Sequence, residues 1–212
     1  MGVDERIMVV PREAVVGPLG YYVAIPITPE ALHREVLAHA YPYPRRAAEE
    51  DERLLQIIPY IALRIGEDGL IGARRLSGGN EQRLHDGFTL GFGGHVRWND
   101  GEDDVDPYRL VDRSVRHEMH EELGITNASV REFTHILLDD TNPVGRVHLG
   151  LLGSLDLLSV MTAEEARRLQ SAEPDKLQLF GISEAFQQDH FDKLEGWGKL
   201  ALRTLRADAF SR

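Results

Sequence analysis

Residues 107–124 read PYRLVDRSVRHEMHEELG, and this stretch decides the fold. A proline opens it, and a glycine, which commonly ends helices, closes it. At about 100° per residue, five side chains fall on one side of a helix. These are Tyr108, Val111, Val115, Met119 and Leu123. The sequence therefore predicts a single helix over 107–123, ended by Gly124, with this apolar stripe buried.

Three glutamates lie along one edge of that stripe. Glu118 and Glu122 are four residues apart, and Glu121 follows Glu118 by three. Like charges at this spacing repel by roughly 0.2–0.5 kcal/mol per pair, and more near a core unless a cation neutralises them. A glutamate-rich helix is most often only a solvated face. These carboxylates border the buried stripe, however, and they follow a glycine-rich strand end whose carbonyls can also approach an ion.

The segments around the helix alternate between strands and helices. Residues 57–65 are rich in β-branched and aromatic residues, and a second strand candidate at 70–76 follows the turn at 67–69, which predicts a hairpin. Further strands are expected at 130–138, 147–155 and 177–182, and further helices at 163–170 and 194–205. Because several neighbouring strands are joined by short turns, the predicted fold class is α/β (α+β), with a mixed sheet between helices.

The N-terminal part is expected to be an appendage. Residues 1–54 contain a strand candidate at 7–10 and a helix start at Thr28-Pro29, and the sequence 41–44 (YPYP) ends that helix. Residues 45–53 are interpreted as a linker or edge, so that 55–212 form the main domain. The appendage is expected to pack on this domain, where it either shapes a pocket or forms a homodimer contact.

The composition excludes several classes of protein. The 212 residues hold 24 Lys and Arg against 35 Asp and Glu, a net charge of −11, and no cysteine. An acidic chain is a poor binder of nucleic acid, and a chain without thiols has no disulfide, thiolate zinc site or cysteine nucleophile. No apolar run approaches the roughly 20 residues of a membrane span, and acids follow Met1. We expect a cytoplasmic protein, and an acidic chain can still hold a phosphorylated small molecule through a divalent cation or a local arginine cluster.

A family resemblance rests on the end of the helix. Residues 117–125 read HEMHEELGI and resemble the second half of the Nudix box, G-x5-E-x7-R-E-U-x-E-E-x-G-U, and Gly93-Gly94 resembles its opening glycines. The resemblance covers about residues 55 to 205. It implies a Nudix-type α/β/α sandwich and a hydrolase of diphosphate bonds that depends on Mg²⁺, with Mn²⁺ as an alternative. In such enzymes the cation neutralises the diphosphate and activates a water.

Two departures from the box affect the site. His117 stands where the family has an arginine, which there orients a helix carboxylate; His117 lies four residues before Glu121 and is placed for the same contact. The spacing from Gly94 to His117 exceeds the pattern by nine residues, so the first box glutamate has no clear counterpart. Glu102 and Asp106 are the candidates.

The resemblance also implies roles for residues. Glu118 and Glu122 would bind metal, Glu121 would bind metal or take a proton from water, His117 would complete the catalytic group, and the Gly93 carbonyl would add a ligand. A further acidic ligand is expected from a late loop, with Glu173 preferred over Asp175.

Other residues are interpreted from their positions. The predicted substrate contacts are Arg75, Arg83, His85 and His95. For the first three, surface charges are an equally open interpretation. For His95 a site position is preferred over a structural histidine. Asp139 and Asp140 are interpreted as loop acids without metal.

The leading hypothesis is a pyrophosphohydrolase that acts on a nucleoside diphosphate linked to another group. The alternative is a catalytically silent Nudix-like module that binds a nucleotide for regulation, as the altered box suggests. The isopentenyl diphosphate isomerase variant of this fold is disfavoured because that chemistry uses cysteine.

Overall fold

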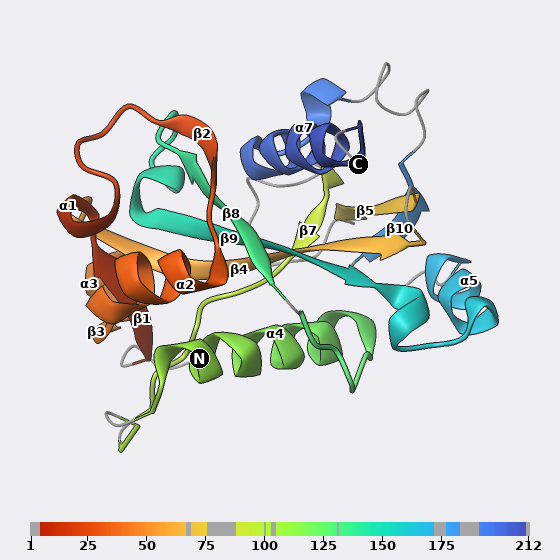
Figure 1. The fold of residues 1–212 in the computed structure, drawn as a ribbon, viewed down its shortest axis with the longest axis horizontal. Helices are drawn as coiled ribbons and strands as arrows, with labels where there is room; N and C mark the ends of the chain where they lie inside the picture. Colours follow the sequence, from red (N-terminus) through yellow and green to blue (C-terminus); the bar gives the residue numbers. More distant parts are fainter. Residues whose placement is uncertain are drawn as a thin grey trace. The chain divides into compact units, whose positions relative to one another are not determined.

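The computed structural model describes residues 5–66, 69–75, 88–99, 101–102, 105–130, 132–171, 177–182 and 191–210 (Figure 1). Its strands are β1 (Arg6–Pro11), β2 (Tyr22–Pro26), β3 (Tyr41–Pro44), β4 (Leu54–Ile65), β5 (Gly69–Arg75), β6 (Phe88–Thr89), β7 (Gly91–Phe92), β8 (Phe133–Asp139), β9 (His148–Asp156) and β10 (Leu177–Gly181). Its α-helices are α1 (Arg12–Val15), α2 (Pro29–Ala31), α3 (Arg45–Ala48), α4 (Pro107–Leu123), α5 (Ala163–Ser171) and α7 (Gly196–Phe210). Shorter helical turns are η1 (Leu32–Val36), η2 (Leu37–His39), η4 (Gly145–Val147), η5 (Leu157–Ser159) and η6 (Phe191–Lys193).

The chain divides by its internal contacts into two compact units. The first holds Met1–Tyr60 and Gly93–Gly153, and the second holds Ile61–Phe92 and Ser154–Arg212. The predicted domain boundary after residue 54 stays a prediction. Within the described residues, no helix combines the length and apolar character that crossing a membrane requires.

In the first unit, the N-terminal strand is built into the fold. β1 runs antiparallel to both β3 and β4, with Val9 opposite Tyr41 on one side and Gln56 on the other. Ile7 and Val9 are fully buried in a cluster with Ala48 and Leu54. Residues 45–53, which we interpreted as a linker or edge, therefore begin with the short helix α3 and contribute to the core.

Two N-terminal elements differ from expectation. Thr28 caps the predicted helix by accepting from Ala31 N at 3.2 Å, but α2 continues only as the π-helical turn η1 and the 3-10 turn η2. The YPYP sequence ends this helical segment and also forms β3. This strand pairs with β1 alone among the described strands, the kind of edge position where prolines without an N–H are tolerated.

The second unit contains the predicted hairpin. The end of β4 pairs antiparallel with β5, with Leu63 opposite Ile71, and β5 pairs in turn with β10, with Ala73 opposite Leu179. In α7, Leu200, Ala201 and Leu205 are buried, as the helical spacing predicted.

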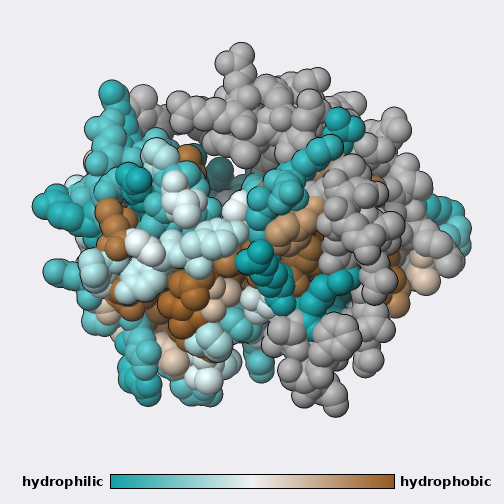
Figure 2. Space-filling view, turned by 90° about the horizontal axis from the view of Figure 1, so that it is seen from above, coloured by the Kyte–Doolittle hydropathy of each residue, from teal (hydrophilic) through white to brown (hydrophobic). Residues whose placement is uncertain are grey.

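On the face drawn in Figure 2, hydrophobic patches lie among hydrophilic side chains, and single exposed apolar side chains are ordinary on folded proteins.

α4 has the bounds that the sequence predicted, and it is the long green helix in Figure 1. Asp106 caps its start by accepting from Tyr108 N at 3.0 Å, and Gly124 ends it in the left-handed conformation with φ 69°. The buried face contains the predicted Val111, Val115, Met119 and Leu123 together with Leu110 and Ser114. Tyr108 is only half-buried and meets the Phe133 ring edge-on at 6.5 Å.

Candidate metal site

The last turns of α4 bring three predicted residues together. His117, Glu118 and Glu121 each offer a ligand atom, and these atoms lie within 4.8 Å of one another. Carboxylate oxygens with an imidazole nitrogen form a donor set that suits a divalent cation. Glu122, the fourth predicted residue, is half-buried on the same turn but outside this group of described side chains.

Glu118 lies directly against the predicted Gly-Gly pair. A Cβ built on Gly94 would be 2.4 Å from Glu118 Oε1, so the carboxylate occupies the space that a side chain would fill. Burial raises the pKa of Glu118; the charges of His117 and Arg97 lower it, and that of Glu121 raises it. A half-buried carboxylate with a raised pKa is stabilised in its ionised form by a cation at its oxygens.

Gly93 is required for a different reason. A Cβ on Gly93 would be 1.7 Å from the carbonyl oxygen of Pro59 in β4, so only glycine allows this close approach of two backbone segments. The approach fixes the start of the segment 93–97, which then runs alongside α4. Ser114 Oγ donates to the His95 carbonyl at 3.3 Å, and Arg113 Nη2 donates to the Arg97 carbonyl at 3.2 Å. The role of the Gly93 carbonyl as a metal ligand stays a prediction.

The predicted contact of His117 is present. Its Nε2 lies 3.2 Å from Glu121 Oε2, and the same nitrogen lies 3.2 Å from Arg97 Nη1. Arg97 Nε donates in turn to Glu5 Oε1 at 2.7 Å. Neither Arg97 nor Glu5 was expected at the site, because neither belongs to a recognisable motif.

The two candidates for the first box glutamate are engaged elsewhere. Glu102 accepts from Arg113 Nη2 at 2.9 Å and from Asn99 N at 2.8 Å, and its hydrogen bonds with Arg113 lower the pKa of Glu102 to about 2. Asp106 is the cap of α4. Both carboxylates therefore stabilise the loop and the start of the helix in this structure.

His95 is part of a polar cluster in the first unit. Its Nε2 lies 2.8 Å from Gln56 Oε1 and 3.2 Å from His148 Nε2, and His148 Nδ1 lies 2.6 Å from the Val144 carbonyl. The carbonyl and amide oxygens only accept, so the protons are assigned to His148 Nδ1 and His95 Nε2. This leaves His95 Nδ1 as an acceptor, which suits a substrate hydroxyl or amino group better than a phosphate oxygen.

The environment of His95 keeps its imidazole neutral. Burial, followed by the charges of Arg45 and His148, lowers the pKa of His95 from 6.5 to about 3. Gln56 is the residue that the sequence could have pointed to, since it is the single polar side chain in the apolar run 54–63. It is fully buried, and its Nε2 lacks a hydrogen-bond partner among the described residues.

We predict that His95 makes folding sensitive to acid. The unfolded chain binds a proton at His95 below about pH 6.5 and the folded chain does not, so stability falls as pH drops through this range. The loss from pH 7 to pH 5 is about 2 kcal/mol. Urea unfolding of the metal-free protein at the two pH values measures it. His95→Gln removes the titrating group, and an equal loss of stability in this variant would contradict the assignment.

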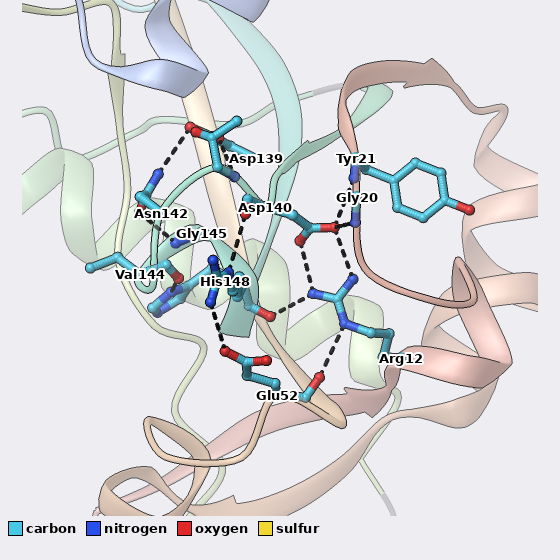
Figure 3. A network of polar contacts seen from close by, with 12 residues as sticks. Arg12, Gly20, Tyr21, Glu52, Asp139, Asp140, Asn142, Val144, Gly145 and His148 are labelled. Carbon is cyan, nitrogen blue, oxygen red and sulfur yellow. Dashed lines mark hydrogen bonds and ion pairs between the residues drawn. The ribbon is translucent and has the colours of Figure 1, made fainter.

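Asp139 and Asp140 are not loop acids, in contrast to the sequence-based interpretation. Both are buried, at 5% and 7% exposure, because β8 extends through Asp139 and the turn after it folds back onto the chain. Asp140 accepts from Arg12 Nη2 and from the backbone N–H groups of Gly20 and Tyr21, each at 3.0 Å (Figure 3). Arg12 also donates to the Glu52 carbonyl at 3.1 Å. Arg12 and Asp140 therefore form a structural ion pair.

The remaining predicted residues are not placed at the site. Arg75 ends β5 in the second unit, opposite Leu177, and its side chain is outside the described part of the structure. Arg83, His85, Glu173 and Asp175 lie outside the described residues. Their predicted roles stay predictions.

Comparison with known proteins found similar chains. The chain is 32% identical over 208 residues to Protein YmaB of Bacillus subtilis (strain 168), covering 95% of this chain and 98% of that protein. It is also similar to the crystal structure of Tm1382, a candidate Nudix hydrolase, with a TM-score of 0.70 and 26% sequence identity over 96% of this chain and 100% of that chain. No family model matches the chain.

The fold and the glutamate helix define a Nudix-type hydrolase, and the chain belongs to the Nudix family. The predicted resemblance and the predicted α/β fold with a mixed sheet and several helices are thereby confirmed. At the level of the family, this fold supports hydrolysis of pyrophosphate bonds with the help of divalent metal ions, and the cluster of His117, Glu118 and Glu121 offers a site for such an ion.

Proposed function

We propose that the protein is a Mg²⁺-dependent pyrophosphohydrolase that cleaves the diphosphate bond of a nucleoside diphosphate linked to another group. The observation that carries this proposal is the close approach of Glu118 and Glu121, with His117 beside them, at the end of α4, where the carboxylate of Glu118 lies against Gly94. The backbone approach at Gly93 and the cap at Gly124 hold both sides of this group in fixed positions.

The proposal assigns roles to this chain's own residues. Glu118 and Glu121 hold the cation, with Glu122 as the third carboxylate, and Glu121 is also positioned to take the proton from the attacking water. Bound Mg²⁺, or Mn²⁺ in its place, supplies charge neutralisation of the diphosphate and activation of that water. His95 contacts a hydroxyl or amino group of the substrate through Nδ1, because a neutral imidazole with this tautomer offers an acceptor there.

A regulatory, catalytically silent module is the second candidate. It is favoured by one specific observation, the engagement of Glu102 by Arg113 and of Asp106 by the helix cap, which leaves the first box glutamate without a counterpart among the described residues. The three glutamates of α4 are nevertheless retained, and a module that only binds a nucleotide has no need for them at this spacing.

A substrate panel separates the two functions. Nucleoside diphosphates linked to sugars, alcohols or a second nucleoside are incubated with the full-length protein, and phosphate release after phosphatase treatment is measured with Mg²⁺, with Mn²⁺ and with a chelator. Metal-dependent release of a monophosphate from one class supports the hydrolase. Nucleotide binding by calorimetry without turnover on any member of the panel supports the regulatory module instead.

A further inference from the structure

The N-terminal segment reaches the candidate metal site through a chain of charged side chains. Arg45 Nη1 donates to Glu5 Oε2 at 3.1 Å, and Glu5 Oε1 accepts from Arg97 Nε at 2.7 Å. Arg97 Nη1 lies 3.2 Å from His117 Nε2, which lies 3.2 Å from Glu121. This series of contacts links the residue before β1 to a proposed metal ligand.

The backbone around Arg97 fixes the direction of its side chain. Met8 N donates to the Val96 carbonyl at 2.8 Å, and Trp98 N donates to the Arg6 carbonyl at 3.0 Å, so β1 pairs with this segment on both sides of Arg97. Val96 and Trp98 are buried, at 0% and 4% exposure. Because side chains alternate along an extended segment, Arg97 points away from the core on which its neighbours are packed.

We propose that Arg97, held by Glu5, is a positioning residue of the metal site, which fixes His117 and through it the carboxylate of Glu121; this rests on the proposed function. A single ring nitrogen can accept from Arg97 or donate to Glu121, and in both cases the imidazole is confined between the two groups. The N-terminal segment thereby acquires a role in the site, beyond the alternatives of a pocket wall or a dimer contact.

Charge supports this arrangement. Arg97 carries a permanent positive charge next to His117, whereas an imidazole carries one only when it is protonated. A guanidinium next to His117 Nε2 also repels a metal ion that approaches this nitrogen, so His117 supports the site from outside and the carboxylates remain the ligands.

The test uses Mn²⁺ as the probe, with the full-length protein and no substrate. The dissociation constant of Mn²⁺ is measured by electron paramagnetic resonance for wild type, Arg97→Gln, Glu5→Gln, His117→Gln and the Arg97→Gln/His117→Gln double variant. Arg116→Gln is the matched control, because Arg116 lies on the same helix and pairs with Asp112 at 2.9 Å. Circular dichroism checks the fold of each variant. Arg97→Lys is measured as well, because it keeps the charge but offers a single donor group.

We expect Arg97→Gln to weaken Mn²⁺ binding about tenfold, as the loss of an outer support does. Glu5→Gln lowers the Mn²⁺ affinity less, and Arg97→Lys has an affinity between those of wild type and Arg97→Gln. The double variant binds Mn²⁺ no more weakly than the single variant with the lower affinity, because Arg97 and His117 act through one contact. Arg116→Gln leaves the affinity unchanged.

Three results overturn the proposal. Tighter Mn²⁺ binding in Arg97→Gln means that Arg97 acts only as a repelling charge. Additive losses of affinity in the double variant mean that Arg97 and His117 act separately. A nitrogen hyperfine coupling to Mn²⁺ means that His117 is itself a ligand. Mn²⁺ affinity is measured without turnover, so the two proposals are tested separately. If no substrate is hydrolysed but the losses of Mn²⁺ affinity are coupled, the proposed function is refuted and the positioning role of Arg97 stands.

Discussion

Glu118→Gln is expected to lower turnover at least about a hundredfold, because removal of a ligand costs no less than removal of an outer support. The same change leaves the metal-free protein as stable as wild type or more stable, since burial already disfavours the charged form of Glu118. Metal that binds only the folded state raises the melting temperature of wild type. We expect this rise to be lost in the variant.

Steady-state kinetics measure the turnover. Scanning calorimetry with and without Mg²⁺ measures the stability of the metal-free protein and the rise in melting temperature. His120→Gln is the control, because His120 is exposed on the same helix and outside the three-residue cluster. Gly94→Ala reaches the same carboxylate from the other side. Its Cβ must displace Glu118, so turnover falls although no ligand is removed. Unchanged turnover in both Glu118→Gln and Gly94→Ala would rule out the assigned site.

Asp140→Ala is expected to destabilise the protein by about 3–5 kcal/mol, because it leaves the charge of Arg12 buried without its partner. The side chains of the pair are only 6% and 2% exposed. Asp140→Asn keeps the size and the acceptor oxygen for Gly20 and Tyr21, but its NH₂ group replaces the oxygen that accepts from Arg12 Nη2, so the variant loses both the charge and this hydrogen bond. Urea unfolding at pH 7 measures both variants.

An exposed pair provides the control for this experiment. Arg34 and Glu35 are 2.7 Å apart, with side chains 72% and 59% exposed, and Glu35→Ala is expected to change stability by less than about 1 kcal/mol. Equal losses in Asp140→Ala and Glu35→Ala would show that the buried position adds nothing.

Local signals explain why α4 could be predicted to the residue. A proline, an apolar period and a terminal glycine all lie within the helix itself or next to it, and each acts on the backbone at that place. The proximity of His117, Glu118 and Glu121 follows from the same helix geometry. The hairpin of β4 and β5 was predicted for the same reason, since its turn and both strands are adjacent in the sequence.

Contacts between distant residues could not be predicted. Arg97 and Glu5 are 92 positions apart, and Arg12 and Asp140 are 128 apart, so that no periodicity or spacing relates them. Asp140 looked like a loop acid because a polar residue after a strand usually is one. The burial that makes it structural arises only when the N-terminal segment folds over it.

The ion pair between Arg12 and Asp140 also has a consequence for the order in which the protein can form during synthesis. Arg12 leaves the ribosome long before Asp140, and its other acceptor, the Arg146 carbonyl, is made later still. Until about two thirds of the nascent chain has emerged, the guanidinium has to stay in water, and closing so long a loop is slow compared with local contacts. We expect the N-terminal segment to lock late, as the step that completes the first unit.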